Sequence, residues 1–242
     1  MRTVAVAIVC KTPRAGASKT RLSPPLTPAE CEELSGCFIR DVCETIASLA
    51  ADQDVTGVAL YTPIGTEVRL KRYVPGSFKL VLQSDGDFGH RLRMGAEDIL
   101  SEGHDGVILV NSDSPTLPRD VLRRAVDAVR RTDNVVLGPA FDGGYTLIGL
   151  SRPHPRLFEN IPWSTADVYR LTVERAAEIG LPVEKVPGWY DVDDAQSLGM
   201  LRDELGGTDI PFLLGINGAT AAATREFING LTISKHATNA AS

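Results

Sequence analysis

Short apolar runs alternate with longer segments of helical periodicity along most of this 242-residue chain, and this alternation constrains the fold more than any other feature. The apolar runs predict strands over residues 3–10, 55–61, 78–82, 106–110, 134–138, 145–150 and 182–187. The longer segments predict helices over 28–50, 66–74, 90–102, 118–131 and 166–180. Repeated strand–helix–strand units predict an α/β protein with a largely parallel sheet and helices on both of its faces.

The segment after the first predicted strand carries only positive charge. Ligands of such sheets bind beyond the carboxyl ends of the strands, so the segments that follow strands are the candidate sites. Here Lys11, Arg14, Lys19 and Arg21 precede the first acidic residue, Glu30. A cationic loop at this edge favours phosphate groups, and Lys19 and Arg21 are the best candidates to bind them. Solvated surface charge remains the alternative, and it fits Lys11 and Arg14 more easily.

Two acidic segments follow later strands. The 106–110 run leads through Asn111 and Ser112 to Asp113. A carboxylate at the tip of a strand is a hard oxygen ligand for Mg²⁺ or Mn²⁺ beside nucleotide phosphates. In the Asp191-Val192-Asp193-Asp194 segment, Asp194 is placed to cap a helix beginning at 195, which leaves one of the other two acids for the metal. The alternative interpretation, in which these acids only cap helices or occupy turns, stays open.

Three further motifs join predicted elements and are weaker signals. The glycine-rich turn contains Asp142, Gly143, Gly144 and Tyr145, which could contact an acceptor or form a plain tight turn. The segment after residue 82 contains Gln83 and Gly89, which are typical of a loop that contacts a nucleobase. Ser164 and Thr165 precede a predicted helix, where a hydroxyl cap and an acceptor contact are both compatible with the sequence.

Composition excludes several classes of protein. A formal net charge of −6 argues against a nucleic-acid partner, because such partners are held by a broad basic surface. The first apolar run is too short to span a membrane. The four cysteines, at positions 10, 31, 37 and 43, form no CxxC pair, which favours free thiols in a cytoplasmic protein.

The composition changes at residue 206, where few charges remain and small residues become frequent. We therefore expect one main domain over residues 1–205 and a C-terminal extension over 206–242. The extension is expected to pack on the domain, to form an oligomer contact such as that of a homodimer, or to be partly mobile, and composition does not choose among these arrangements.

Taken together, these motifs resemble those of the radical-SAM/selenodomain-associated transferase family. This family belongs to the nucleotide-diphospho-sugar transferase superfamily and is similar to 2-phospholactate guanylyltransferase. The resemblance spans about residues 3–204, and the motifs that carry it are Lys19–Leu22, Gly86–Arg91, Ser112–Pro115, Gly138–Tyr145, Trp163–Thr165 and Asp191–Asp193. It implies the glycosyltransferase-A fold, a three-layer αβα arrangement around a mainly parallel mixed sheet.

The resemblance also implies roles for individual residues. By analogy with sugar-nucleotide pyrophosphorylases, Gln83 and Gly89 contact the nucleobase, and Lys19 and Arg21 contact the phosphates. Asp113 and Asp193 hold Mg²⁺ or Mn²⁺. The acceptor would face the segment from Asp142 to Tyr145.

Two hypotheses about function follow from these motifs. The first is a metal-dependent transferase that takes a nucleoside triphosphate or sugar nucleotide and moves a nucleotidyl or glycosyl group to a small acceptor. In this hypothesis Lys19, Arg21 and Asp113 act in catalysis by electrostatics, and no protein nucleophile is needed. The second is a non-catalytic protein that binds a nucleotide or a partner on the same fold.

Overall fold

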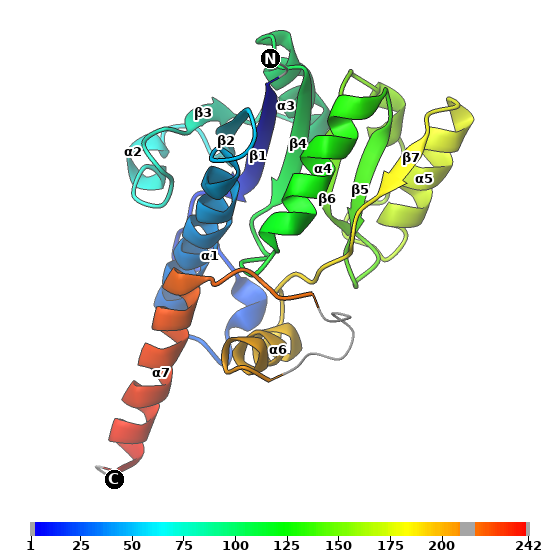
Figure 1. Ribbon diagram of the computed structural model, residues 1–242. Coiled ribbons are helices and arrows are strands. Elements are labelled where there is room, and N and C mark those ends of the chain that lie inside the picture. The colour runs from blue at the N-terminus through cyan, green and yellow to red at the C-terminus, as the bar shows by residue number, and fades with distance from the viewer. Residues whose placement is uncertain (1–2, 209–215, 241–242) are drawn as a thin grey trace.

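The computed structural model describes residues 3–208 and 216–240, and for 232–240 it describes the backbone alone. A sheet of seven strands forms the centre of the described part, in the order β3-β2-β1-β4-β6-β5-β7 (Figure 1). The strands are β1 (Val4–Lys11), β2 (Val55–Thr62), β3 (Lys79–Leu82), β4 (Gly106–Asn111), β5 (Val135–Pro139), β6 (Tyr145–Leu150) and β7 (Val183–Lys185). The α-helices are α1 (Pro28–Leu49), α2 (Glu67–Leu70), α3 (Phe88–Ser101), α4 (Arg119–Arg131), α5 (Val168–Glu178), α6 (Ala195–Leu205) and α7 (Ala222–Ala240), and the short 3₁₀ helices are η1 (Thr20–Leu22) and η2 (Pro155–Phe158).

Helices cover both faces of the sheet, so the expected three-layer αβα arrangement is confirmed. Alternate residues of a strand point to opposite faces, and β1 shows this directly. Val4, Val6 and Ile8 pack into the core beneath α1 and α4, whereas Ala5 and Ala7 pack into the core beneath α3. Because both faces are buried, β1 is apolar from Val4 to Cys10 and not alternately polar.

One strand runs against its neighbours in the described sheet, which makes the sheet mixed and mainly parallel, as expected. β6 pairs antiparallel with both β4 and β5. The turn through Asp142 and Gly143 brings the chain back directly after β5, and a short return of this kind produces an antiparallel pair. The turn therefore lies at the same edge as the carboxyl ends of β4 and β1.

Capping side chains fix the helix starts that flank this edge. The Asp87 carboxylate accepts a hydrogen bond from the His90 N–H at 2.8 Å and begins α3. Asp194 accepts from the Ser197 N–H at 2.8 Å and begins α6, so the predicted cap is confirmed. Such caps satisfy backbone N–H groups that have no partner within the helix.

One predicted helix is much shorter in the structure, and the tail contains a further helix. The helix predicted over 66–74 is only the single turn of α2, which ends at Leu70 and is followed by turns over residues 71–73. The tail contains α7, which starts against α1, where Asp41 accepts hydrogen bonds from the N–H groups of Ala223 and Thr224 at 2.9 Å each (Figure 1). Residues 209–215 of the predicted extension lie outside the described residues, and its boundary and dimer contact stay predictions.

The described helices include none that is both long enough and apolar enough to cross a membrane. All four cysteines are buried free thiols, as the sequence predicted.

Candidate active site

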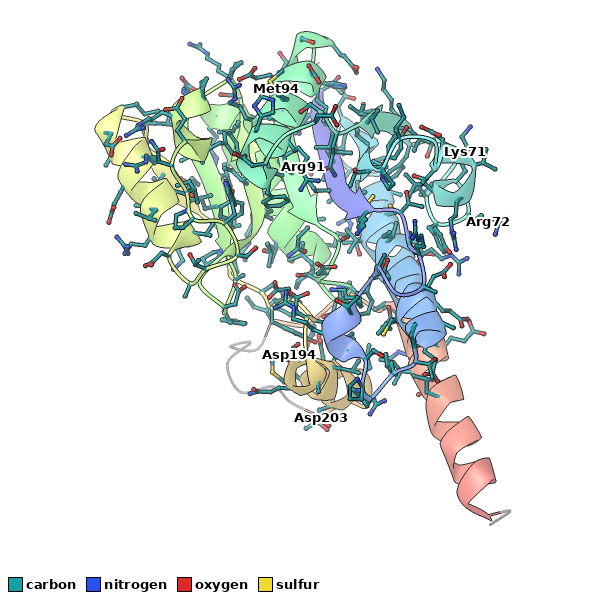
Figure 2. All side chains as sticks on the ribbon, turned by 180° about the vertical axis from the view of Figure 1, so that it is seen from behind. Lys71, Arg72, Arg91, Met94, Asp194 and Asp203 are labelled. Carbon is teal, nitrogen blue, oxygen red and sulfur yellow. The ribbon has the colours of Figure 1, made fainter. Side chains whose placement is uncertain are left out.

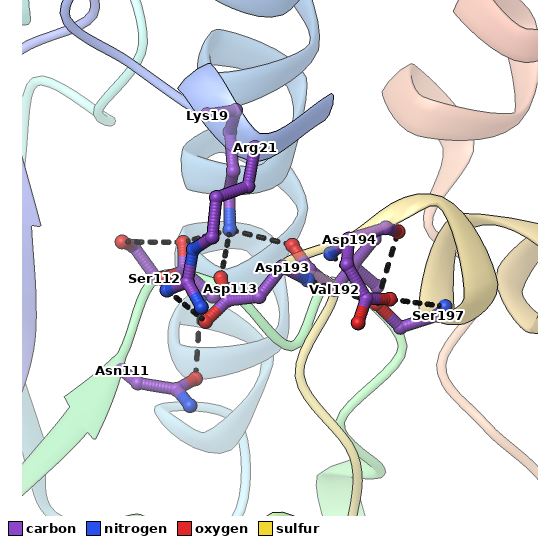
Figure 3. A network of polar contacts seen from close by, with 9 residues as sticks. All are labelled: Lys19, Arg21, Asn111, Ser112, Asp113, Val192, Asp193, Asp194 and Ser197. Atoms are coloured by element: carbon purple, nitrogen blue, oxygen red, sulfur yellow. Dashed lines mark hydrogen bonds and ion pairs between the residues drawn. The ribbon is translucent and has the colours of Figure 1, made fainter. Parts of the chain in front are cut away.

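Lys19 connects the two acidic segments at the carboxyl edge of the sheet. Its ammonium nitrogen lies 2.7 Å from Asp113 Oδ1 and 3.0 Å from Asp193 Oδ1, and it donates to the Val192 carbonyl at 2.7 Å (Figure 3). The three segments follow β1, β4 and β7 in the chain, and they meet only because parallel strands end at one edge. Side chains separated by up to 174 positions thus share one ion network.

The environment of Lys19 keeps this cation charged. Burial alone would lower the pKa of Lys19, but the neighbouring charges of Asp113 and Asp193 outweigh it and raise the pKa above its ordinary value. The ammonium group also lies 5.3 Å from the centre of the Phe38 ring. Lys19 has a left-handed backbone, with φ at +49°, which is uncommon for a residue with a side chain. Its three donors are all used within the protein, so the ammonium group is a fixed bridge between carboxylates.

Arg21 occupies the solvent side of the same network. One guanidinium nitrogen lies 3.2 Å from Asp193 Oδ2, while the side chain as a whole is 74% exposed. A guanidinium group has five N–H donors, and this contact uses few of them. Arg21 can therefore contact an incoming phosphate without leaving Asp193.

Two pockets meet at these residues. The first, of about 370 Å³, is called the cationic pocket because Lys11, Lys19, Arg21 and Arg91 line it, together with Gln83. The second, of about 300 Å³, is called the acidic pocket because Asp142 and Asp191 line it, together with Gly144, Tyr145, Trp163, Ser164 and Thr165. Arg21, Asp113 and Asp193 line both pockets. The geometry suits two ligands that meet over the Asp113–Asp193 pair.

The polar end of the cationic pocket is built from Gln83 and Arg91. The Gln83 amide nitrogen donates to the Leu60 carbonyl at 2.9 Å and to the Cys10 carbonyl at 3.3 Å. Its amide oxygen accepts from Arg91 at 3.2 Å, and the Arg91 guanidinium carbon lies 5.6 Å from the centre of the Phe88 ring. Gln83 thus holds Arg91, which projects from α3 (Figure 2). The Arg91 Nε atom is buried without a hydrogen-bond partner in the described part of the chain.

The acidic pocket gathers carboxylates against an aromatic wall. Burial raises the pKa of Asp191 to about 6, and the charges of Asp142 and Asp193 contribute to the rise. Trp163 forms the wall between two other rings, with its ring centre 5.2 Å from that of Phe88 and 6.4 Å from that of Tyr145, both in edge-to-face geometry. This pocket therefore combines negative charge with an apolar surface.

Residues 45–165, half of the chain, match the model of the DUF2064 family, described as "Uncharacterized protein conserved in bacteria". The chain belongs to the DUF2064 family. Family membership by itself names no reaction.

This DUF2064 protein is similar to transferases that act with nucleotides. It is 29% identical over 192 residues to the 2-phospho-L-lactate guanylyltransferase of Methanothermobacter thermautotrophicus, a match that covers 75% of this chain and 77% of that protein. A crystal structure from Desulfovibrio desulfuricans G20, provisionally described as a nucleotide-diphospho-sugar transferase, superposes with a TM-score of 0.79 at 28% identity and covers 93% of this chain and 95% of that one. CMP:2-keto-3-deoxy-manno-octonic acid synthetase in complex with CTP has the same fold at 12% identity, with a TM-score of 0.55 over 85% of this chain and 99% of that one.

These similarities confirm the nucleotide-diphospho-sugar transferase fold, of glycosyltransferase-A type, and the likeness to 2-phospholactate guanylyltransferase. The association with radical-SAM proteins that the motifs implied is addressed by none of them and stays a prediction.

In the described part of this DUF2064 protein, three of the predicted site residues line neither pocket: Arg14, Gly89 and Gly143. Gly89 packs beneath Trp163, where a Cβ atom would lie 2.4 Å from the indole nitrogen. Gly143 has φ at +92°, and a Cβ there would lie 2.2 Å from the Ala166 carbonyl oxygen. Both glycines allow close packing of the walls, and their contacts with ligands stay predictions.

The structure also adds Arg91, to which the sequence assigned no role, and it places Asp191, which the sequence left as an alternative to Asp193 for the metal, in the lining of the acidic pocket. Arg91 stands inside the quoted Gly86–Arg91 motif, and Asp191 inside the acidic segment, but spacing alone does not show which side chains face a pocket. The one signal for Asp191 is its two-residue spacing from Asp193, which places both on one side of an extended chain.

Proposed function

We propose that this protein is a divalent-metal-dependent transferase that binds a nucleoside triphosphate or a sugar nucleotide and moves a nucleotidyl or glycosyl group to a small acceptor. The observation that carries the proposal is the contact of Lys19 with Asp113 and Asp193 where a cationic and an acidic pocket meet. The nucleotide phosphates would enter the cationic pocket, and the acceptor would enter the acidic one. The 29% identity to a guanylyltransferase supports the same reaction class.

The residues at the junction fit a divalent cation. The two pockets are lined by four carboxylates, those of Asp113, Asp142, Asp191 and Asp193. Among the described residues, only Lys19 and Arg21 form ion pairs with them. Two negative charges are therefore left without a cationic partner. The contacts of the Asp113 carboxylate with Lys19 and Ser112 both use Oδ1.

A complete metal cage of three or more His, Cys, Asp or Glu side chains is absent from the described residues. Mg²⁺ does not need such a cage, because proteins hold it through one or two carboxylates together with substrate phosphates and water. Asp113 and Asp193 would hold it in this way. Once bound, the cation would offset charge on the phosphate oxygens.

The protein's own residues would then act by position and charge. Lys19 fixes the distance between Asp113 and Asp193, so that both carboxylates are preorganised before the ligand arrives. Arg21 is exposed and lines both pockets, which lets it contact the phosphate at which the bond breaks. Arg91 would bind the more distant part of the nucleotide. The acceptor attacks in line from the acidic pocket, so the chemistry depends on orientation and needs no protein nucleophile.

A thermal-shift panel of the common nucleoside triphosphates and sugar nucleotides, each with and without Mn²⁺, tests the proposal. A ligand that binds only the native state raises the melting temperature by mass action. We expect at least one nucleotide to do so only when Mn²⁺ is present, and to lose the effect in Asp113→Asn. Asp203→Asn, an exposed aspartate of α6 outside both pockets, is the matched control.

The products separate the two reactions. Release of pyrophosphate from a triphosphate marks nucleotidyl transfer, whereas release of a nucleoside diphosphate from a sugar nucleotide marks glycosyl transfer. A nucleotide that binds equally well with and without metal, to both the wild type and Asp113→Asn, and that yields no product with any acceptor, would instead support the non-catalytic alternative.

A further inference from the structure

The acidic pocket differs from the cationic pocket in the kind of ligand that its walls can hold. Arg21 is the one cationic side chain among the described residues that line it, and this guanidinium already pairs with Asp193 at 3.2 Å. Asp142 and Asp191 have no cationic partner within the described chain. A phosphate or carboxylate on the acceptor would therefore meet like charge on this side.

A bound divalent cation does not reverse this conclusion. The four carboxylates at the junction carry four negative charges, and Lys19 and Arg21 supply two positive ones. One divalent cation would offset the remaining two. The acidic pocket would then be close to neutral, with no positive charge left for an anionic acceptor and no negative charge left to attract a cationic one.

The walls of the pocket suit a molecule with both apolar and hydroxyl-bearing surface. Trp163 and Tyr145 present ring surface, and Leu92 and Ile148 add aliphatic surface. Asp142 and Asp191 accept hydrogen bonds, which is what hydroxyl groups donate. Tyr145 adds an independent signal, because its phenolic oxygen is buried and has no hydrogen-bond partner among the described residues. Buried polar atoms in proteins are nearly always paired, so a hydroxyl-bearing ligand that reaches Tyr145 would supply the missing partner.

From these observations we infer that the acceptor is a small, uncharged polyhydroxy compound, a polyol or a sugar that carries neither phosphate nor carboxylate. The inference rests on the proposed transferase function and names the acceptor class of the same site. A pocket of about 300 Å³ is near the lower limit for ligand sites, which sets the size at about that of a monosaccharide. This acceptor class differs from the phosphorylated acid that is specified in the name of the similar guanylyltransferase.

Three matched pairs test the inference: glycerol and glycerol 3-phosphate, glucose and glucose 1-phosphate, and inositol and inositol 1-phosphate. Binding is measured by saturation-transfer NMR on the full chain, loaded with Mg²⁺ and the nucleotide found in the thermal-shift panel. We expect at least one uncharged compound to bind, and its phosphorylated counterpart to bind at least tenfold more weakly. Preference for the phosphorylated member of each pair, or binding of none of the six, would overturn the inference.

Asp142→Asn provides a second readout that does not depend on guessing the acceptor. Asparagine keeps the oxygen that accepts from the Gly144 N–H at 2.8 Å, so the turn is retained while one negative charge is removed. We expect the phosphorylated compounds to bind roughly fivefold more tightly to this variant, and the uncharged compounds to bind no more tightly than they do to the wild type. Asp203→Asn is the control and should leave both unchanged.

The two proposals fail in different ways. If no nucleotide binds with metal, the transferase function itself is wrong. If a nucleotide binds as expected but the phosphorylated acceptors bind best and Asp142→Asn does not strengthen them, only the acceptor class is wrong.

Discussion

The two pockets share Arg21, Asp113 and Asp193, but they are built by different halves of the sheet. The cationic pocket is formed beside β1 and β2, where strands are parallel and the loop after β1 brings Lys19. The acidic pocket is formed beside β6, where the antiparallel turn brings Asp142. Cationic and acidic side chains therefore gather beside different halves of the sheet, and the carboxylates of Asp113 and Asp193 line both pockets. Such a division suits a reaction in which an anionic donor and an uncharged acceptor must meet without exchanging places.

The largest effect should come from the shared carboxylates. In Asp113→Asn, the charge that pairs with Lys19 and fits the metal is lost, while the size of the side chain is kept. We expect turnover to fall by about 10²–10³-fold, the range seen when one preorganised electrostatic group is removed. Product formation with the nucleotide from the thermal-shift panel measures this.

Asp193→Ala should lower turnover in the same way, and Asp194→Ala is its control, since the two acids are adjacent. Asp194 caps α6, so its loss should lower the free energy of unfolding by about 0.5–2 kcal/mol with little effect on turnover. Equal losses of turnover in the two variants would contradict the separation of a shared site from a structural cap.

Lys19→Met should have the next largest effect, and it tests how the junction is held together. Methionine keeps the unbranched stem near Phe38 but leaves Asp113 and Asp193 without their common cation. We expect nucleotide affinity to fall by about tenfold, and Mn²⁺ alone to raise the melting temperature more than it does in the wild type. Calorimetric scans with and without Mn²⁺ measure the second effect.

Lys71→Met, on an exposed lysine after α2 (Figure 2), should respond to Mn²⁺ as the wild type does. If Lys19→Met gains no more from Mn²⁺ than this control does, the carboxylate pair is not a cation site.

Smaller, opposite effects should distinguish the two pockets from each other. Arg91→Leu removes the guanidinium held by Gln83, and we expect the nucleotide Kd to rise about tenfold while the acceptor KM stays the same. Asp142→Asn should raise the acceptor KM and leave the nucleotide Kd unchanged. Titration calorimetry and acceptor kinetics measure the two constants. Parallel changes in both constants for both variants would show that the pockets do not serve separate ligands.

Much of the fold follows from the sequence because its signals are local. The run of apolar residues that forms β1 is buried on both faces, and its ends are predicted within one residue. Asp194 is predicted as a cap because capping depends on residues only three positions apart. The extent of α2 could not be predicted as well, since a single helical turn has little periodicity of its own.

The internal geometry of the site is harder to predict because it depends on contacts between distant segments. The sequence placed Lys19 near phosphates, but its bridge to Asp113 and Asp193 needs the relative positions of three loops. Gln83 was assigned to a nucleobase from its place after a strand, whereas its amide bonds to backbone carbonyls and to Arg91. Residue type therefore indicates the chemistry of the site, and only tertiary structure shows which partner each side chain has.

The smallest expected effect is on the stability of the metal-free protein. It tests whether the carboxylates of the acidic pocket repel one another more than surface carboxylates elsewhere do. The pKa of Asp191 is raised to about 6 from the ordinary value of 3.8, first by burial and then by the charge of Asp142. Between these values the native carboxyl holds more protons than the unfolded chain does, so the free energy of unfolding falls as the pH rises from about 4 to about 6. Partial solvent exposure limits the change to the order of 1–2 kcal/mol. Urea unfolding at several pH values, with a chelator present, measures it.

Asp191→Asn should lose this pH-dependent component and be more stable than the wild type above pH 6, because it carries no charge to bury. Adding Mg²⁺ to the wild type should reduce the same component, since a cation near Asp193 relieves the crowding. Asp203→Asn should follow the wild-type curve at every pH, because this residue is exposed and lines neither pocket. Coincident curves for all three proteins would mean that the acidic pocket is no more crowded with charge than an ordinary surface, and the contrast between the two halves of the site would be lost.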